Sequence, residues 1–157
     1  MSNNTNGSDP SRIGGLRSKD VKYLVVHCSA TKPSMNIGAA EIDRWHRQKG
    51  WRKIGYHFVI KRDGTIEPGR GLTEIGAHAA GYNSVSIGIC LVGGVSEQDV
   101  KKAENNFTTP QMKALRYLLS NLLDISFPKA EVLGHRDLPG VAKDCPSFDV
   151  KKWAYGS

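Results

Sequence analysis

The feature that most constrains the fold is the segment Lys22–Cys28, which reads KYLVVHC. Its apolar residues are almost continuous, a pattern typical of a strand that is buried on both faces of a sheet. Such a strand needs further strands at its edges and helices over its faces, as in an α/β sheet. A second run of the same kind, SIGICLV at Ser86–Val92, predicts another buried strand.

Helical and strand-like patterns alternate along the rest of the chain. Helices are predicted at Gly38–Lys49 and at about Pro110–Ile125, the second with Thr109 as its cap. The apolar stripe of the second helix consists of Met112, Leu115, Leu118, Leu119, Leu122 and Ile125. The shorter predicted elements are strands at Tyr56–Lys61, Thr65–Glu67 and Glu131–Leu133 and a helical turn near Asp149–Trp153. The predicted fold class is therefore α/β, a single domain with a central mixed sheet flanked by helices.

The start of the chain differs in composition from the remainder. Residues 1–20 are rich in Ser, Asn, Gly and charge, which predicts a flexible N-terminal arm with an optional helical turn near Ile13–Leu16. Residues 21–157 are predicted to form one compact domain, because a chain of 157 residues suits a single core. We expect this domain to be a monomer.

Several classes of protein are disfavoured by composition. No apolar run approaches the length of a membrane span, and MSNNTNGSDPSR lacks the apolar stretch of a secretory signal. We therefore expect synthesis in the cytoplasm, without a signal peptide. The net charge of +7 suits a polyanionic partner, but the basic residues are scattered. We accordingly expect no specific nucleic-acid partner.

Two histidines and one cysteine stand where open α/β sheets assemble their sites. His27 ends the first buried strand, His135 follows the last strand in LGHRD, and Cys145 comes ten residues later in KDCPSFD. Two imidazoles and a thiolate are good zinc ligands and leave a fourth position for water, as in catalytic zinc sites. The odd number of cysteines argues against a disulfide framework and leaves a thiol for this purpose. The spacing alone does not establish the site, because His27 is remote in sequence from the other two residues.

Five blocks occur in a fixed order: HCSATKPS, GYHFVIKRDGTIEPGR, HAAGYNSVSIGICLVGG, GHRD and CPSFD. Together they resemble the type-2 N-acetylmuramoyl-L-alanine amidases, which share their fold with peptidoglycan recognition proteins. Within that family they are most similar to the small lytic amidases of T-odd podovirus bacteriophages. The resemblance covers about Val21 to Trp153. It implies a zinc hydrolase that cleaves the amide between N-acetylmuramic acid and L-alanine in peptidoglycan, as an endolysin that reaches the wall after holin-type release.

The resemblance also assigns residues. It implies that His27, His135 and Cys145 bind one Zn²⁺ per chain, and that Tyr56 and Lys143 are catalytic. Zinc lowers the pKa of bound water toward ~7, and the Lys143 cation suits the stabilisation of an oxyanion. Tyr56 could hold the water or donate a hydrogen bond to the tetrahedral intermediate. Which of these two residues moves protons stays open at this point.

The other histidines have competing interpretations. His78, in the small-residue loop GAHAAG, is predicted to contact substrate, the alternative being a loop histidine bonded to the backbone. His57 follows Tyr56 in a strand and is predicted to be interior. His46 is predicted to pack on a helix face, whereas Trp51 could pack or contact sugar.

Two alternative functions follow from the same resemblance. Some relatives bind peptidoglycan without cutting it, typically after losing the cysteine ligand, so Cys145 favours catalysis here. The phage relatives also bind and inhibit the phage RNA polymerase, partly through their N-terminal segment. Since the arm of this chain is different and longer, an RNA polymerase partner does not transfer directly.

Overall fold

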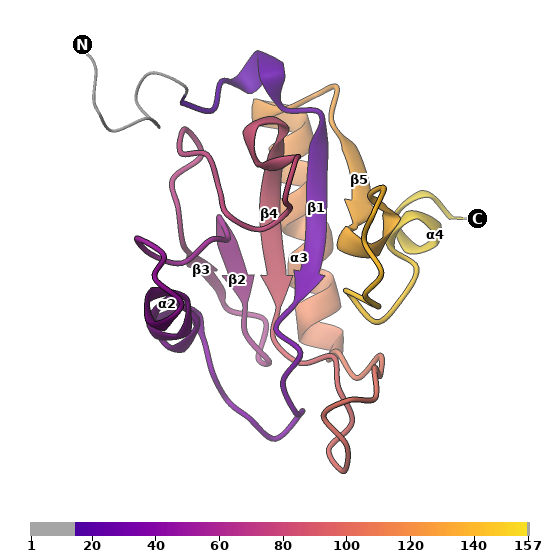
Figure 1. Ribbon diagram of the computed structural model, residues 1–157. Helices are drawn as coiled ribbons and strands as arrows, with labels where there is room; N and C mark the ends of the chain where they lie inside the picture. The colour runs from indigo at the N-terminus through magenta and orange to yellow at the C-terminus, as the bar shows by residue number, and fades with distance from the viewer. Residues whose placement is uncertain (1–14, 157) are drawn as a thin grey trace.

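The computed structural model describes residues 15–156, and its centre is a five-stranded sheet with the order β3-β2-β4-β1-β5 (Figure 1). The strands are β1 (Tyr23–Cys28), β2 (Phe58–Ile60), β3 (Ile66–Pro68), β4 (Ser86–Leu91) and β5 (Glu131–Gly134). β1 pairs in parallel with β4 and β5, β2 pairs in parallel with β4, and β2 and β3 form an antiparallel hairpin. The predicted α/β class with a central mixed sheet is therefore confirmed.

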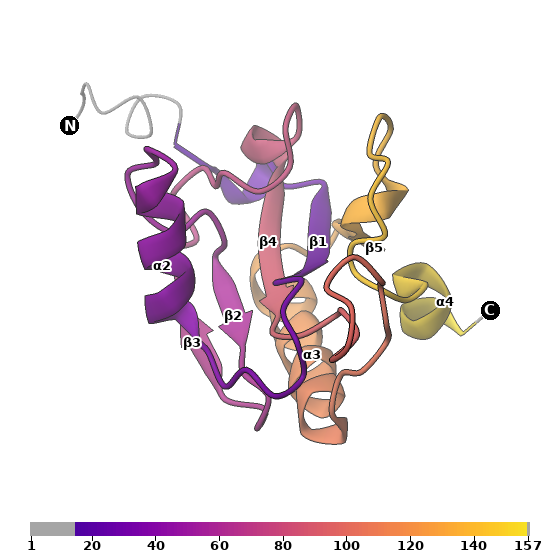
Figure 2. The same ribbon diagram turned by 60° about the horizontal axis from the view of Figure 1, so that its bottom comes forward.

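Helices cover both faces of this sheet. They are α2 (Ala39–Gln48), α3 (Thr109–Asn121) and α4 (Val150–Tyr155), with short helical turns η1 (Ser18–Asp20), η2 (Asn83–Val85), η3 (Leu122–Ser126) and η4 (His135–Asp137). α3 lies behind the sheet, α2 lies on the other side next to β2, and α4 lies beside β5 (Figures 1 and 2). No helix within residues 15–156 is long and apolar enough to cross a bilayer.

The alternation of side chains along β1 divides the interior into two parts. Leu24 and Val26 point toward α3 and join Leu115 in the larger core. Val25 points to the opposite face, where it packs with Leu133. Because successive strand residues alternate, His27 shares the face of Val25 and points away from α3. The face opposite α3 is therefore where His27 can build a site.

The N-terminus of α3 differs from the prediction by one residue. Thr108, rather than Thr109, is the cap: its Oγ1 accepts a hydrogen bond from the Gln111 N–H at 3.1 Å. The Gln111 side chain accepts from the Thr108 N–H in return, at 2.9 Å. This reciprocal capping box satisfies two backbone donors that the first turn of a helix otherwise leaves unpaired.

The C-terminal end of the predicted helix is also different. Regular α-helical winding ends at Asn121, and Leu122–Ser126 forms a π-helical turn. The wider turn rotates Ile125 outward, where 77% of its surface is exposed. Ile125 was thus wrongly predicted to belong to the apolar stripe, and the buried Phe127 occupies the core beyond Leu122 instead.

The last residues of the predicted arm contact the domain. Leu16 is only 3% exposed, belongs to the larger core, and donates its backbone N–H to Thr73 O at 2.9 Å. η1 follows directly and the Ser18 hydroxyl donates to Ser126 O. The packed part of the chain therefore includes residues 15–20, because Leu16 has an apolar site to fill. Residues 1–14, with part of the predicted turn near Ile13–Leu16, lie outside the described residues.

Gln111 joins α3 to the ends of two strands and provides a test of the fold. Its side chain is 0% exposed, and its Nε2 donates to Ile60 O at 3.1 Å and to Val92 O at 2.9 Å. We expect Gln111→Leu to lower the free energy of unfolding by roughly 2 kcal/mol, because the backbone carbonyls of Ile60 and Val92 lose the donor that Gln111 supplies. Urea unfolding measures this change. The exposed Lys113→Ala should change stability by less than ~0.5 kcal/mol, and equal midpoints for the two variants would contradict the assignment.

Candidate metal centre

His27 and His135 meet because β1 and β5 end at the same edge of the sheet. The register of this parallel pair places Val26 opposite Gly134, and a histidine follows each of these two residues in the chain. The two imidazole centroids are 4.4 Å apart, and His27 is 2% exposed. Asp137 closes the turn after β5, since its Oδ2 accepts from the Gly134 N–H at 2.8 Å. The GHRD motif thus presents its histidine on a turn that the aspartate stabilises.

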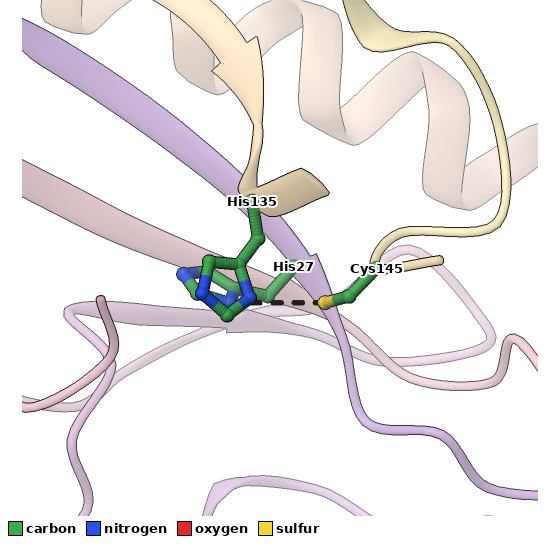
Figure 3. A group of neighbouring side chains, drawn as sticks. All are labelled: His27, His135 and Cys145. Atoms are coloured by element: carbon green, nitrogen blue, oxygen red, sulfur yellow. Dashed lines mark hydrogen bonds between the residues drawn. The ribbon is translucent and has the colours of Figure 1, made fainter. Parts of the chain in front are cut away.

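Cys145 reaches the same place from the C-terminal loop. The backbone N–H of Arg136 donates to Cys145 O at 2.7 Å, which fastens this loop to the turn that carries His135. The Cys145 Sγ accepts from the Cys28 N–H at 3.3 Å and lies 3.8 Å from His27 Nδ1. Figure 3 shows the two imidazoles and the thiol converging from three separate segments of the chain.

These three residues fit a zinc ion. One potential ligand atom from each of His27, His135 and Cys145 lies within 4.8 Å of the other two. Zinc–ligand bonds of about 2.0–2.3 Å place neighbouring ligands of a tetrahedral ion roughly 3.5 Å apart. The separation of 3.8 Å between His27 Nδ1 and Cys145 Sγ is close to that value. The structure therefore brings together the three residues predicted as ligands.

The electrostatic environment keeps the two imidazoles neutral. Burial lowers the pKa of His27 well below its usual value, and the neighbouring His78 and His135 lower it further. Burial also lowers the pKa of His135, with a further contribution from the Lys143 cation. A hydrogen bond with the Cys28 thiol, together with burial, raises the pKa of Cys145. Neutral imidazoles are ready to bind a metal, whereas this thiol needs a nearby cation to lose its proton.

A cavity of about 330 Å³ is lined by neighbours of the three residues rather than by the three residues themselves. Its lining consists of Cys28, Ser29, Ala30, Ile42, Trp45, His46, Lys49, Tyr56 and Lys143. The Tyr56 ring lies 5.0 Å from the His27 ring, and burial raises the pKa of its phenol well above the usual value. Lys143 is exposed at the same cavity. Both residues predicted to be catalytic thus line one cavity beside the candidate ligands, although their roles stay predictions.

A larger cavity of about 600 Å³ lies over the outer surface of α3. Its lining includes Met112, Arg116 and Trp153 and contains neither Tyr56 nor Lys143. The smaller cavity is therefore the candidate site, because Cys28 and Tyr56 in its lining contact the candidate ligands.

His78 lies directly behind His27. Its Nδ1 is 2.9 Å from His27 Nε2, and its backbone N–H donates to Asn83 Oδ1 at 2.9 Å. Burial, with a further contribution from His57, lowers the pKa of His78 to about 3. The sequence interpretation missed this contact, for which Gly88 in the middle of a buried strand was the available signal. The predicted contact of His78 with substrate stays a prediction.

The two remaining histidines have defined partners. His57 is 0% exposed, accepts from the Gly88 N–H at Nδ1 (3.0 Å), and bonds Glu74 O through Nε2 (2.8 Å), so its predicted interior position is confirmed. His46 is buried and accepts from the Gly55 N–H at 2.9 Å, in agreement with packing. It also lines the cavity, which its helical pattern did not indicate.

Comparisons with known proteins agree with this geometry. Residues 17–148 match the family described as N-acetylmuramoyl-L-alanine amidase. The chain is 51% identical over 142 residues to an endolysin of Escherichia phage T7, covering 90% of this chain and 91% of that protein. It is 32% identical over 138 residues to peptidoglycan-recognition protein SC2 of Drosophila melanogaster, covering 83% and 70%. A solved structure of the endolysin N-acetylmuramoyl-L-alanine amidase LysCS from Clostridium intestinale URNW matches with a TM-score of 0.71 and 30% identity, over 86% of this chain and 80% of that one. The predicted family is confirmed, and the chain belongs to the N-acetylmuramoyl-L-alanine amidases.

Proposed function

We propose that this protein is a zinc-dependent endolysin that hydrolyses the amide between N-acetylmuramic acid and L-alanine in peptidoglycan. The observation that carries the proposal is the convergence of His27, His135 and Cys145 within 4.8 Å, beside a cavity lined by Tyr56 and Lys143. Similarity to phage endolysins supports the lytic role and the wall substrate. In this role the protein is made in the host cytoplasm and reaches the wall after holin-type release.

The residues of the cavity suit amide hydrolysis. When bound, zinc supplies a Lewis acid and lowers the pKa of a water toward ~7. Tyr56 keeps its phenolic proton near neutral pH, because burial raises its pKa, and this proton is available to donate a hydrogen bond. Lys143 provides a positive charge at the same cavity. Both groups are therefore suited to stabilise the negative charge that develops on the carbonyl oxygen.

In this proposal the catalytic domain consists of the predicted residues 21–157, with residues 15–20 packed against them, and holds one zinc per chain. An RNA polymerase partner stays an alternative, and the monomeric state stays a prediction.

The bond that is cut distinguishes this proposal from other wall hydrolases. Digestion of purified peptidoglycan should release new amino groups from L-alanine and no new reducing sugar ends, because water adds across an amide. Mass spectrometry and amine labelling identify the products, and a parallel digestion with a chelator should be inactive. Reducing ends without new amines would indicate a glycosidase, which needs a carboxyl pair at a sugar bond.

The thiolate ligand can be tested by one substitution. Cys145→Ser should lower both the zinc content, from about one ion per chain, and the rate of peptidoglycan hydrolysis, because a hydroxyl is a much poorer zinc ligand. Metal analysis and turbidity assays measure the two quantities. Cys90→Ser is the matched control, since Cys90 lies in the core and is not a candidate ligand. Full activity of metal-free Cys145→Ser would reject the zinc mechanism.

The same measurements distinguish the proposed catalytic roles of Tyr56 and Lys143 from the role of the metal ligands. Tyr56→Phe and Lys143→Ala should keep zinc and bind peptidoglycan, yet lose turnover by on the order of a hundredfold, as oxyanion donors do. The matched controls are Tyr117→Phe and Lys129→Ala, both at exposed positions outside the cavity. Near wild-type turnover in both zinc-loaded variants would remove these two residues from the mechanism.

A further inference from the structure

Two glycines form a slot for the imidazole of His78. A Cβ atom at Gly88 would lie 2.6 Å from His78 Cγ, and one at Gly76 would lie 2.7 Å from His78 Cδ2. Glycine within a strand weakens it unless another group must approach the backbone closely. Gly88 stands in the middle of β4, on the strand that pairs with β1. The absence of a side chain at Gly88 therefore leaves room for the His78 ring behind His27.

The hydrogen bonds around His78 determine where its proton lies. The Ser86 hydroxyl donates its only proton to Tyr82 O at 2.7 Å, because a carbonyl can only accept. Toward His78 Nε2, 3.3 Å away, the same hydroxyl oxygen can then only accept. A neutral His78 accordingly carries its proton on Nε2, and its Nδ1 is an acceptor.

The tautomer of His78 determines the tautomer of His27. His78 Nδ1 lies 2.9 Å from His27 Nε2, so the hydrogen bond between them requires the proton to be on His27 Nε2. His27 Nδ1 then has a free lone pair. This is the nitrogen that lies 3.8 Å from Cys145 Sγ. A chain of hydrogen bonds from Tyr82 O through Ser86 and His78 thus directs the lone pair of His27 toward the other candidate ligands.

We propose that His78 is a positioning residue, which fixes His27 as the Nε2–H tautomer and aims its Nδ1 lone pair at the metal. The proposal rests on the proposed zinc function. Metal-ligating histidines generally donate their other N–H to an acceptor that fixes tautomer and ring orientation. Here the acceptor is a neutral imidazole, which must itself have a fixed tautomer, and Ser86 supplies that constraint.

The tautomer can be observed without metal or substrate. Long-range ¹H–¹⁵N correlation spectra of the ¹⁵N-histidine-labelled, metal-free full chain distinguish a protonated from an unprotonated ring nitrogen. We expect the proton on Nε2 of both His27 and His78. A proton on Nδ1 of His27 would overturn the proposal. Failure of the wild-type protein to bind zinc would instead reject the proposed function and leave this measurement intact.

Two substitutions at His78 test its effect on metal affinity. His78→Leu removes the acceptor, whereas His78→Gln offers an amide oxygen to the His27 N–H. Competition with a chromogenic chelator should show zinc affinity reduced 10–100-fold in the leucine variant and substantially recovered in the glutamine variant. Unchanged affinity in His78→Leu, or equal losses in both variants, would overturn the proposal. A higher KM with unchanged zinc affinity would also overturn it and assign His78 to substrate contact.

A milder variant keeps the test decisive if His78→Leu fails to fold. Ser86→Ala removes the acceptor for His78 Nε2–H and leaves both histidines in place. We expect a second tautomer of His78 in the spectra, with partial loss of the His27 Nε2–H form and weaker zinc binding. Wild-type tautomers together with wild-type zinc affinity in this variant would overturn the proposal. Ser96→Ala is the control, since Ser96 is a buried serine whose hydroxyl bonds Gln98.

Discussion

The parallel pairing of β1 with β5 is the constraint on which the site depends. Its register sets Val26 opposite Gly134, and His27 and His135 therefore follow side by side. A slip by one residue would turn a strand's side chains to the opposite face and separate the two imidazoles. Apolar packing opposes such a slip, because Val26 packs in the larger core beneath α3 and Val25 packs with Leu133 on the opposite face of the sheet. The packing of β1 thus determines the geometry of the ligands.

Behind the ligands lies a set of buried polar groups that have defined partners. His57 is bonded on both ring nitrogens, and His78 lies between His27 and Ser86. Groups of this kind are stabilising only when their hydrogen bonds are made, since an unpaired buried donor is strongly unfavourable. Gly88 provides the room that this arrangement needs. The sheet is therefore less densely filled with apolar side chains here than on its α3 face.

The cavity side of the site has a different character. Lys143 is exposed and supplies a positive charge. Burial raises the pKa of the Tyr56 phenol, so Tyr56 keeps its proton. Both come from loops that precede or follow strands, where backbone geometry is free to place a side chain against a substrate. Among the candidate ligands, His27 lies within β1, His135 begins the turn that follows β5, and Cys145 lies in the loop fastened to that turn. The groups proposed to act on the substrate lie in loops.

Periodicity and local chemistry in the sequence determined the α/β class, the strands and helices, and the three ligand candidates through an ordered set of motifs. They failed where a residue's neighbours come from remote segments. The spacing of Ile125 suits the apolar stripe of an α-helix. In the structure the π-helical turn η3 leaves Ile125 exposed, and Phe127 is the buried residue after Leu122. His78 resembles an ordinary loop histidine, and only the folded chain places it 2.9 Å from His27. Hydrogen bonds over 51 residues of separation leave no local pattern, so tertiary structure alone decided which nitrogen of His27 is free.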